Sequence, residues 1–151
     1  MFKLFFARKE NEEELKSFLK ATTQLTDDDL SVVNVLNPTL TKEHVQEKDF
    51  IVDIRLTDAA GNHIHIEMQA RSHDAFIERM VAYNSRQYAS QLNRGEDYAQ
   101  LKKSISLIVT GFQMFNDTDD HLEYITYRRK NGNVFTSAQE YFILDVTKIP
   151  R

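Results

Sequence analysis

Residues 50–70 read FIVDIRLTDAAGNHIHIEMQA, two runs of alternating residues on either side of a turn rich in Asp, Gly and Asn. Alternation with a period of two is typical of β-strands, and the turn residues between the runs predict a β-hairpin. One face of the hairpin is apolar and is expected to be buried; it consists of Phe50, Val52, Ile54, Leu56, Ile64, Ile66 and Met68. The opposite face carries Asp53, Arg55, His63, His65, Glu67 and Gln69.

The length of the turn predicts which residues of the polar face are neighbours. If residues 58–62 form the loop, Thr57 pairs with His63, and counting back along both strands places Asp53 opposite Glu67. Directly paired side chains have Cβ atoms roughly 5 Å apart, so both carboxylates could contact one ion. Polar alternation is also typical of a solvated hairpin face, which is the alternative interpretation of these residues.

The elements on either side predict an α/β fold. Residues 12–25 and 74–93 have helical periodicity, and Gly95 is placed to terminate the second helix. Residues 31–36 (SVVNVL) predict a strand that ends at Asn37-Pro38, whereas the nearly continuous apolar run of residues 104–112 predicts a central strand. Asn131-Gly132 and residues 141–146 indicate two or more further strands. This order predicts a mixed β-sheet flanked by helices, in a single domain over residues 1–151.

Composition limits the possible functions. The chain has 151 residues and no cysteine, which excludes disulfides, thiolate zinc sites and a thiol nucleophile and fits a reducing cytoplasm. We expect no signal peptide and no membrane span. The net charge of −4 argues against DNA binding by bulk electrostatics, although local basic surfaces could coexist with it. The motifs GxSxG, GxGxxG and the P-loop are absent.

The polar face of the hairpin suits phosphodiester hydrolysis by a bound magnesium ion. Magnesium prefers oxygen ligands and keeps several waters, so two carboxylates and one backbone carbonyl are a sufficient contribution from the protein. Asp53 and Glu67 would supply the carboxylates, and the carbonyl of Met68 is the expected third ligand.

Asp53, thirteen intervening residues and Glu67-Met68-Gln69 resemble the PD-(D/E)XK signature. More specifically, the chain resembles the bacterial PD-(D/E)XK family transposases, also called Rpn recombination-promoting nucleases, over almost its whole length. Further landmarks are Phe2-Lys3-Leu4-Phe5-Phe6, Leu36-Asn37-Pro38, Lys48 with Ile51-Val52-Asp53-Ile54, Gly61 with Ile66, and residues 88–91 with Gly95 and Tyr98.

The resemblance implies a restriction-endonuclease-like core of order αβββαβ with additional C-terminal strands. It implies a DNA endonuclease that uses Mg²⁺, with Mn²⁺ as a substitute, and that has Asp53, Glu67 and Gln69 as catalytic residues. DNA would be the partner, and a homodimer is compatible with it. The alternative is a catalytically inactive, transposase-derived domain that binds DNA or associates with itself.

The chain departs from the wider fold in two places. Gln69 stands where many nucleases of this fold carry a lysine, although this subfamily resembles the present chain in using glutamine; an amide orients water but brings no charge. The chain also stops at residues 147–151, roughly where a helical extension follows in longer relatives, so we expect that extension to be missing.

Three groups of side chains leave alternatives open. His63 and His65 are a rival zinc or manganese site, or simply exposed histidines. Arg79 and Arg86, seven residues apart on one helical face, are predicted DNA contacts, or part of a solvated helix surface. Lys102-Lys103 and residues 128–130 are similarly ambiguous.

Overall fold

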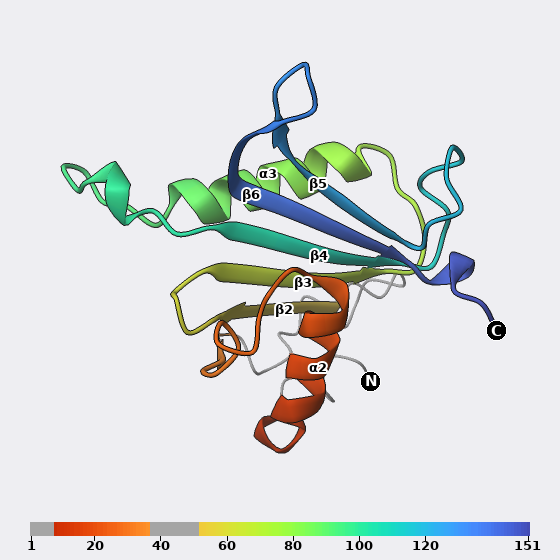
Figure 1. The fold of residues 1–151 in the computed structure, drawn as a ribbon, viewed down its shortest axis with the longest axis horizontal. Helices are drawn as coiled ribbons and strands as arrows, with labels where there is room; N and C mark the ends of the chain where they lie inside the picture. Colours follow the sequence, from red (N-terminus) through yellow and green to blue (C-terminus); the bar gives the residue numbers. More distant parts are fainter. Residues whose placement is uncertain (1–7, 37–51) are drawn as a thin grey trace.

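A six-stranded mixed sheet is the centre of the computed structural model, which describes residues 8–36 and 52–151 (Figure 1). The strands are β1 (Asn34–Val35), β2 (Val52–Thr57), β3 (His63–Gln69), β4 (Ser104–Thr110), β5 (Leu122–Arg128) and β6 (Val134–Asp145). Their spatial order is β1-β2-β3-β4-β6-β5. In the described part of the chain, two α-helices, α2 (Glu12–Thr22) and α3 (Phe76–Ala89), accompany the sheet, with short 3-10 turns η1 (Lys9–Asn11), η3 (Tyr98–Gln100) and η4 (Val146–Lys148).

The β2–β3 hairpin has the register that its sequence predicts. Thr57 pairs with His63 and Asp53 pairs with Glu67, in antiparallel strands. The loop is fixed by Asp58, whose Oδ1 accepts hydrogen bonds from the backbone N–H groups of Ala60 at 3.0 Å and Asn62 at 2.9 Å. This Asp-centred turn determines which residues of β2 face which residues of β3.

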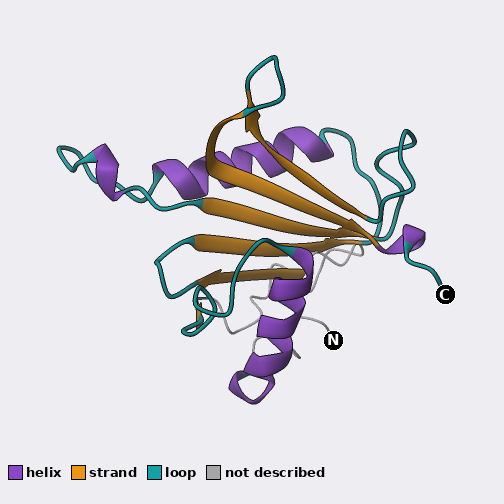
Figure 2. Cartoon of the chain, viewed as in Figure 1, coloured by secondary structure: helices purple, strands orange, loops and turns teal. Residues whose placement is uncertain are grey.

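The middle of the sheet is parallel. β4 pairs in parallel with β3 on one side and with β6 on the other, and all seven of its residues are buried. A central strand that is covered on both faces is therefore confirmed for this segment. Because β3 and β4 run in the same direction, the chain must cross back between them, and α3 makes this crossing (Figure 2).

The two faces of the sheet pack against different helices. The larger apolar cluster joins α2 to the sheet and includes Leu15, Leu19, Leu25, Leu30, Ile54, Leu56, Ile64, Ile66, Ile105, Leu107 and Phe142. The smaller cluster lies under α3 and consists of Phe76, Met80, Ile108, Tyr141 and Ile143. Much of the α3-facing surface is therefore left to polar side chains.

Several predicted boundaries were wrong. The first helix ends at Thr22, and the strand expected over residues 31–36 is confined to Asn34–Val35. A turn explains the short strand, since the N–H of Ser31 donates to the carbonyl of Asp28 and holds residues 28–31 out of the sheet.

The second helix ends at Ala89, before Gly95, and the central strand ends at Thr110. Both hydrogen-bonding groups of the Gln91 side chain bond to the backbone of Lys102, which turns the chain toward β4. Several predictions lie outside the described residues: the landmarks at residues 2–6, 37–38, 48 and 51, and the burial of Phe50. The side chain of Val52 is likewise not described.

The mixed α/β sheet with a helix on each face agrees with the predicted fold class. Within residues 8–36 and 52–151, no helix has both the length and the apolar character needed to cross a membrane.

Candidate active site

The side chains singled out on the hairpin are buried between the sheet and α3. Asp53 is 8% exposed, Glu67 is 3% exposed and Gln69 is 1% exposed. The alternative interpretation, a solvated hairpin face, is therefore wrong for these three residues. The sequence pattern of the hairpin could not reveal this, because the cover comes from a helix that follows in the chain.

The two carboxylates are cross-strand neighbours on one face. Asp53 and Glu67 occupy directly paired positions of β2 and β3. Asp53 also contacts two basic side chains of the next pair: its Oδ1 makes a short contact with His65 Nε2, and its Oδ2 lies 3.7 Å from Nε of Arg55. The Asp53 carboxylate thus lies beside an imidazole and a guanidinium.

Arg79 of α3 holds the other two residues. Its Nη2 donates to Oε1 of Glu67 at 2.8 Å and to Oε1 of Gln69 at 3.0 Å. The sequence predicted Arg79 as a DNA contact, whereas the structure places its guanidinium directly on the carboxylate and the amide. No sequence signal links these positions, because Arg79 and the hairpin lie on separate elements.

The contact with Arg79 also determines the orientation of the Gln69 amide. A guanidinium only donates hydrogen bonds, so the Gln69 atom that faces it must be the oxygen. The Nε2 donor is buried and has no hydrogen-bond partner among the described residues. A buried donor without a partner is costly, and a water or a substrate oxygen could satisfy it.

Two further buried polar atoms without hydrogen-bond partners among the described residues lie on the strands next to Gln69. Gln69 pairs with Thr110, and Thr110 pairs with Asp145. Within the described part of the chain, Thr110 Oγ1 and Asp145 Oδ2 lack hydrogen-bond partners, as does Nε of Arg79. The carboxyl ends of β3, β4 and β6 therefore offer unsatisfied donors and acceptors beside the carboxylate pair.

The donor set fits magnesium better than zinc. Asp53 and Glu67 provide two carboxylates at directly paired positions, and a backbone carbonyl such as that of Met68 would complete a protein share typical of Mg²⁺. Among residues 8–36 and 52–151, the His, Asp and Glu side chains form no group of three or more that could hold a metal ion. His65 is engaged with Asp53, and His63 lines a neighbouring pocket.

An asparagine of α3, which the sequence did not single out, fixes the helix over the site. Asn84 is 1% exposed, and its Nδ2 donates to Ser106 Oγ at 2.9 Å, to the Ser104 carbonyl at 3.1 Å and to the Glu140 carbonyl at 3.3 Å. Its Oδ1 accepts from Nε2 of Gln139 at 3.0 Å. The two serines within an otherwise apolar strand were the available signal, since buried hydroxyls need partners.

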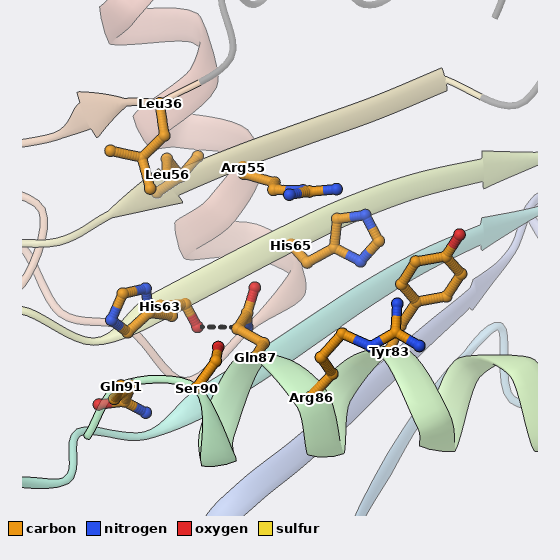
Figure 3. A pocket seen from close by; sticks show the side chains of 10 residues that line it. All are labelled: Leu36, Arg55, Leu56, His63, His65, Tyr83, Arg86, Gln87, Ser90 and Gln91. Atoms are coloured by element: carbon orange, nitrogen blue, oxygen red, sulfur yellow. Dashed lines mark hydrogen bonds between the residues drawn. The ribbon is translucent and has the colours of Figure 1, made fainter. Parts of the chain in front are cut away.

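Arg86, the other predicted DNA contact, is exposed and lines a pocket of about 310 Å³ next to the carboxylates (Figure 3). The pocket is formed by β2, β3 and α3, with Leu36 at its edge; it is lined by Leu36, Arg55, Leu56, His63, His65, Tyr83, Arg86, Gln87, Ser90 and Gln91. Arg55 and His65 belong to both the pocket and the surroundings of Asp53.

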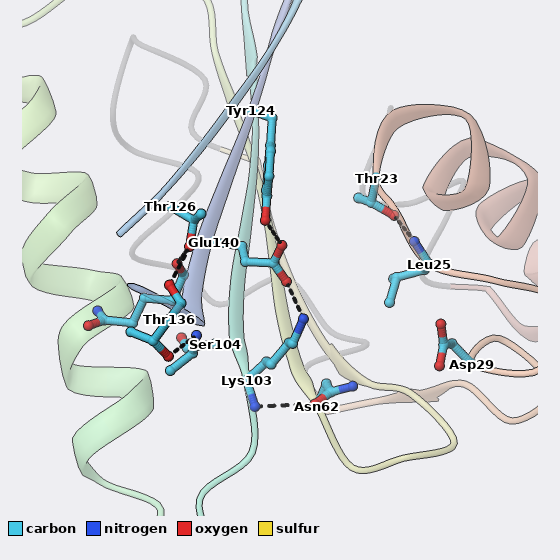
Figure 4. A network of polar contacts seen from close by, with 12 residues as sticks. Thr23, Leu25, Asp29, Asn62, Lys103, Ser104, Tyr124, Thr126, Thr136 and Glu140 are labelled. Carbon is cyan, nitrogen blue, oxygen red and sulfur yellow. Dashed lines mark hydrogen bonds and ion pairs between the residues drawn. The ribbon is translucent and has the colours of Figure 1, made fainter. Parts of the chain in front are cut away.

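The other buried glutamate belongs to a separate network on the α2-facing side. Figure 4 shows Glu140 between Tyr124, whose hydroxyl makes a short hydrogen bond to it, and Lys103, whose Nζ lies 3.0 Å away. Burial and the hydrogen bond to Glu140 raise the pKa of Tyr124 to about 12. These contacts satisfy the Glu140 carboxylate locally, so it is not a candidate for the site.

One of three comparisons with known proteins gave a match. The chain matches a family model described as PD-(D/E)XK nuclease family transposase, and the match covers residues 1–151. Neither the curated proteins nor the solved structures gave a match. The mixed sheet flanked by helices is consistent with a PD-(D/E)XK, restriction-endonuclease-like fold.

Proposed function

The chain belongs to the PD-(D/E)XK nuclease family transposases, and we propose that it is a Mg²⁺-dependent DNA endonuclease of the recombination-promoting type. The observation that carries this proposal is the pairing of Asp53 with Glu67 at buried positions of adjacent strands. Burial of two carboxylates at paired positions of adjacent strands is costly unless cations accompany them. A cation-binding role accounts for both residues.

Asp53, Glu67 and the carbonyl of Met68 would hold the metal ion. When bound, Mg²⁺ would polarise the phosphate and lower the pKa of the attacking water. Mn²⁺ prefers similar oxygen ligands and would substitute for it.

Gln69 and Arg79 would share the work that a lysine performs in many nucleases of this fold. The free Nε2 donor of Gln69 would position the attacking water or a phosphate oxygen. The Arg79 guanidinium, 3.0 Å from the Gln69 oxygen, would supply positive charge for the phosphate in the transition state. Arg86 would contact DNA beyond the scissile group.

A second candidate function is an inactive domain that binds DNA or a second copy of itself. The observation that favours it is the pairing of both carboxylates with protein groups, Asp53 with His65 and Glu67 with Arg79. A site whose charges are balanced in this way is stable without metal. The two functions differ in whether Mg²⁺ displaces these partners.

The test is plasmid nicking in Mg²⁺ by the parent protein, Asp53→Ala and a matched control, Asp119→Ala. Asp119 is exposed in the loop between β4 and β5. We expect Asp53→Ala to lose roughly two orders of magnitude or more in rate, as loss of a metal ligand or transition-state group does, and Asp119→Ala to match the parent. Equal nicking by the parent and Asp53→Ala would refute the role of Asp53. Folded parent protein with no nicking in Mg²⁺ or Mn²⁺ would favour the inactive domain.

A further inference from the structure

Helix α3 and strand β3 face each other in matched steps. Four residues of helix advance roughly 6 Å and two residues of strand advance roughly 7 Å, so the two repeats stay nearly in phase. Arg79 meets Glu67 and Gln69, and four residues later Tyr83 meets His65, with ring centroids 6.0 Å apart. One further helical turn brings the Gln87 amide to the carbonyl of His63. The second and third of these contacts, Tyr83 with His65 and Gln87 with His63, line the pocket, which lies directly beyond the carboxylates.

The pocket wall combines an aromatic face with cations. Tyr83 is 42% exposed, and its hydroxyl has no hydrogen-bond partner in the described part of the chain. Arg86 has no ion-pair partner among residues 8–36 and 52–151, although the protein carries 23 acidic residues. Figure 3 shows Tyr83 and Arg86 projecting from α3 toward the side of the pocket that His65 and Arg55 form. A partner with a flat ring and a negative charge would satisfy both residues.

We propose that this pocket binds one nucleotide of a DNA strand, adjacent to the scissile phosphate, with its base against Tyr83 and its phosphate beside Arg86 and Arg55. The inference rests on the proposed nuclease function and specifies its substrate. The pocket volume of about 310 Å³ lies at the small end of ligand pockets, which suits one nucleoside. Its position one strand step, roughly 7 Å, from the Asp53–Glu67 pair suits the nucleotide next to the bond that is cut.

The same geometry favours unpaired DNA. A base can enter a pocket only after it leaves the helical stack, and this costs least in a single strand or at a mismatch. An aromatic side chain can stack on the ring face of any base. The pocket should therefore distinguish a nucleotide with a base from an abasic one, but not one base from another. The substrate class is therefore single-stranded or locally unpaired DNA, with little sequence preference.

Binding of short labelled strands, measured by fluorescence anisotropy in EDTA, tests the pocket without any cleavage. The probes are a thymidine hexanucleotide and the matching hexamer with abasic sugars. We expect the parent to prefer the base-bearing strand by roughly 5- to 100-fold, the range typical of stacking on an aromatic side chain. Tyr83→Ala should abolish the preference and Tyr83→Phe should keep it. Arg86→Ala should weaken binding of both strands and lower the salt slope by about one.

The matched control is Tyr98→Ala, because Tyr98 is 81% exposed in η3 and does not line the pocket. Its affinities should equal those of the parent. An unchanged base preference in Tyr83→Ala, or an equal loss in Tyr98→Ala, would overturn the assignment of the pocket. Because no metal is present, the result does not depend on nicking activity. A protein that nicks DNA but shows no base preference would refute the pocket alone, and one that binds but never nicks would refute the endonuclease alone.

Discussion

Gln69 stands at the motif position where many nucleases of this fold have a lysine, and the guanidinium of Arg79 contacts its amide. The amide oxygen accepts from Arg79 at 3.0 Å, and the amide nitrogen is left for a water or a phosphate oxygen. A lysine has one charged group for both tasks, whereas in the proposed mechanism this chain would divide orientation and charge between two elements. The departure at Gln69 therefore need not mean a loss of positive charge in the site.

This division predicts the behaviour of a small mutant series. Gln69→Ala should slow nicking by roughly 10- to 1000-fold, as removal of one positioned polar group does. Gln69→Lys alone should give no gain, because the new ammonium would lie beside Arg79 and the two cations repel each other. The double variant Gln69→Lys, Arg79→Ala should recover part of the lost rate. Nicking rates at one Mg²⁺ and one salt concentration measure this. A single Gln69→Lys variant that is faster than the double variant would contradict the shared role.

Tyr124 gives a prediction for alkaline pH. Burial, together with its hydrogen bond to Glu140, raises the Tyr124 pKa to about 12, and burial likewise raises the Tyr141 pKa to about 12. An unfolded tyrosine titrates near pH 10, so the folded protein favours the protonated form. The stabilisation is complete below about pH 10 and is lost as pH rises toward 12.

Urea unfolding between pH 8 and 11.5 should show this loss as a falling free energy of unfolding. In Tyr124→Phe the decline should be shallower, since one of these two tyrosines is gone. At pH 8 the same variant should be less stable by roughly 1.5–3 kcal/mol, the usual contribution of a hydrogen bond to a charged group. An identical pH profile in the parent and in Tyr124→Phe would assign the alkaline loss to other groups.

At the scale of elements, α3 is held to the sheet by hydrogen bonds as well as by apolar contact. Asn84→Ala removes a side chain that bonds to β4 and β6 and leaves several buried partners unsatisfied. We expect the free energy of unfolding to fall by roughly 2–4 kcal/mol. Asn93→Ala is the matched control, because Asn93 is exposed and bonds only locally to Glu96, and it should change stability by less than about 0.5 kcal/mol. Equal urea midpoints for the two variants would mean that apolar packing alone holds α3.

The elements that could be predicted from sequence are those whose information is local. The register of Asp53 and Glu67 follows from alternation and one turn, and the structure has that register. The run from Ser104 is apolar enough to indicate a strand covered on both faces. The strand expected at residues 31–36 was mostly wrong, since the competing turn depends on specific bonds of Asp28 and Ser31.

The surroundings of the site could not be predicted, because they depend on how α3 lies across the sheet. Polar alternation in the hairpin looks the same whether water or a helix covers it. The burial of Glu67 and its contact with Arg79 exist only because the crossover brings α3 over β3. The candidate residues could thus be chosen from the hairpin alone, but the side chains that contact them could not.

On the scale of the whole molecule, the two faces of the sheet divide stability from the proposed chemistry. The α2-facing side holds the larger apolar cluster, whereas the α3-facing side carries Asp53 and Glu67 with their partners. Burying these carboxylates contributes little to the free energy of folding. The charge of Glu67 is balanced by the ion pair with Arg79. Global stability should therefore respond to any cation that joins or replaces Arg79.

This coupling gives a prediction for thermal stability that does not depend on cleavage. A metal ion that binds only the folded state stabilises it by roughly 2.7 kcal/mol at one hundred times its dissociation constant, which is several degrees in the unfolding midpoint of a chain of this size. In the parent, Mg²⁺ has to compete with Arg79, which lies 2.8 Å from Glu67. In Arg79→Ala or Arg79→Gln the carboxylate loses that partner, so the midpoint in EDTA should be lower and the rise on adding Mg²⁺ should be larger than in the parent. Asp53→Ala should show little or no rise.

Differential scanning calorimetry of the four proteins across a Mg²⁺ titration measures all of these shifts. A rise in Asp53→Ala equal to that of the parent would place the metal elsewhere. A smaller rise in both Arg79 variants than in the parent would mean that Arg79 supports metal binding instead of opposing it.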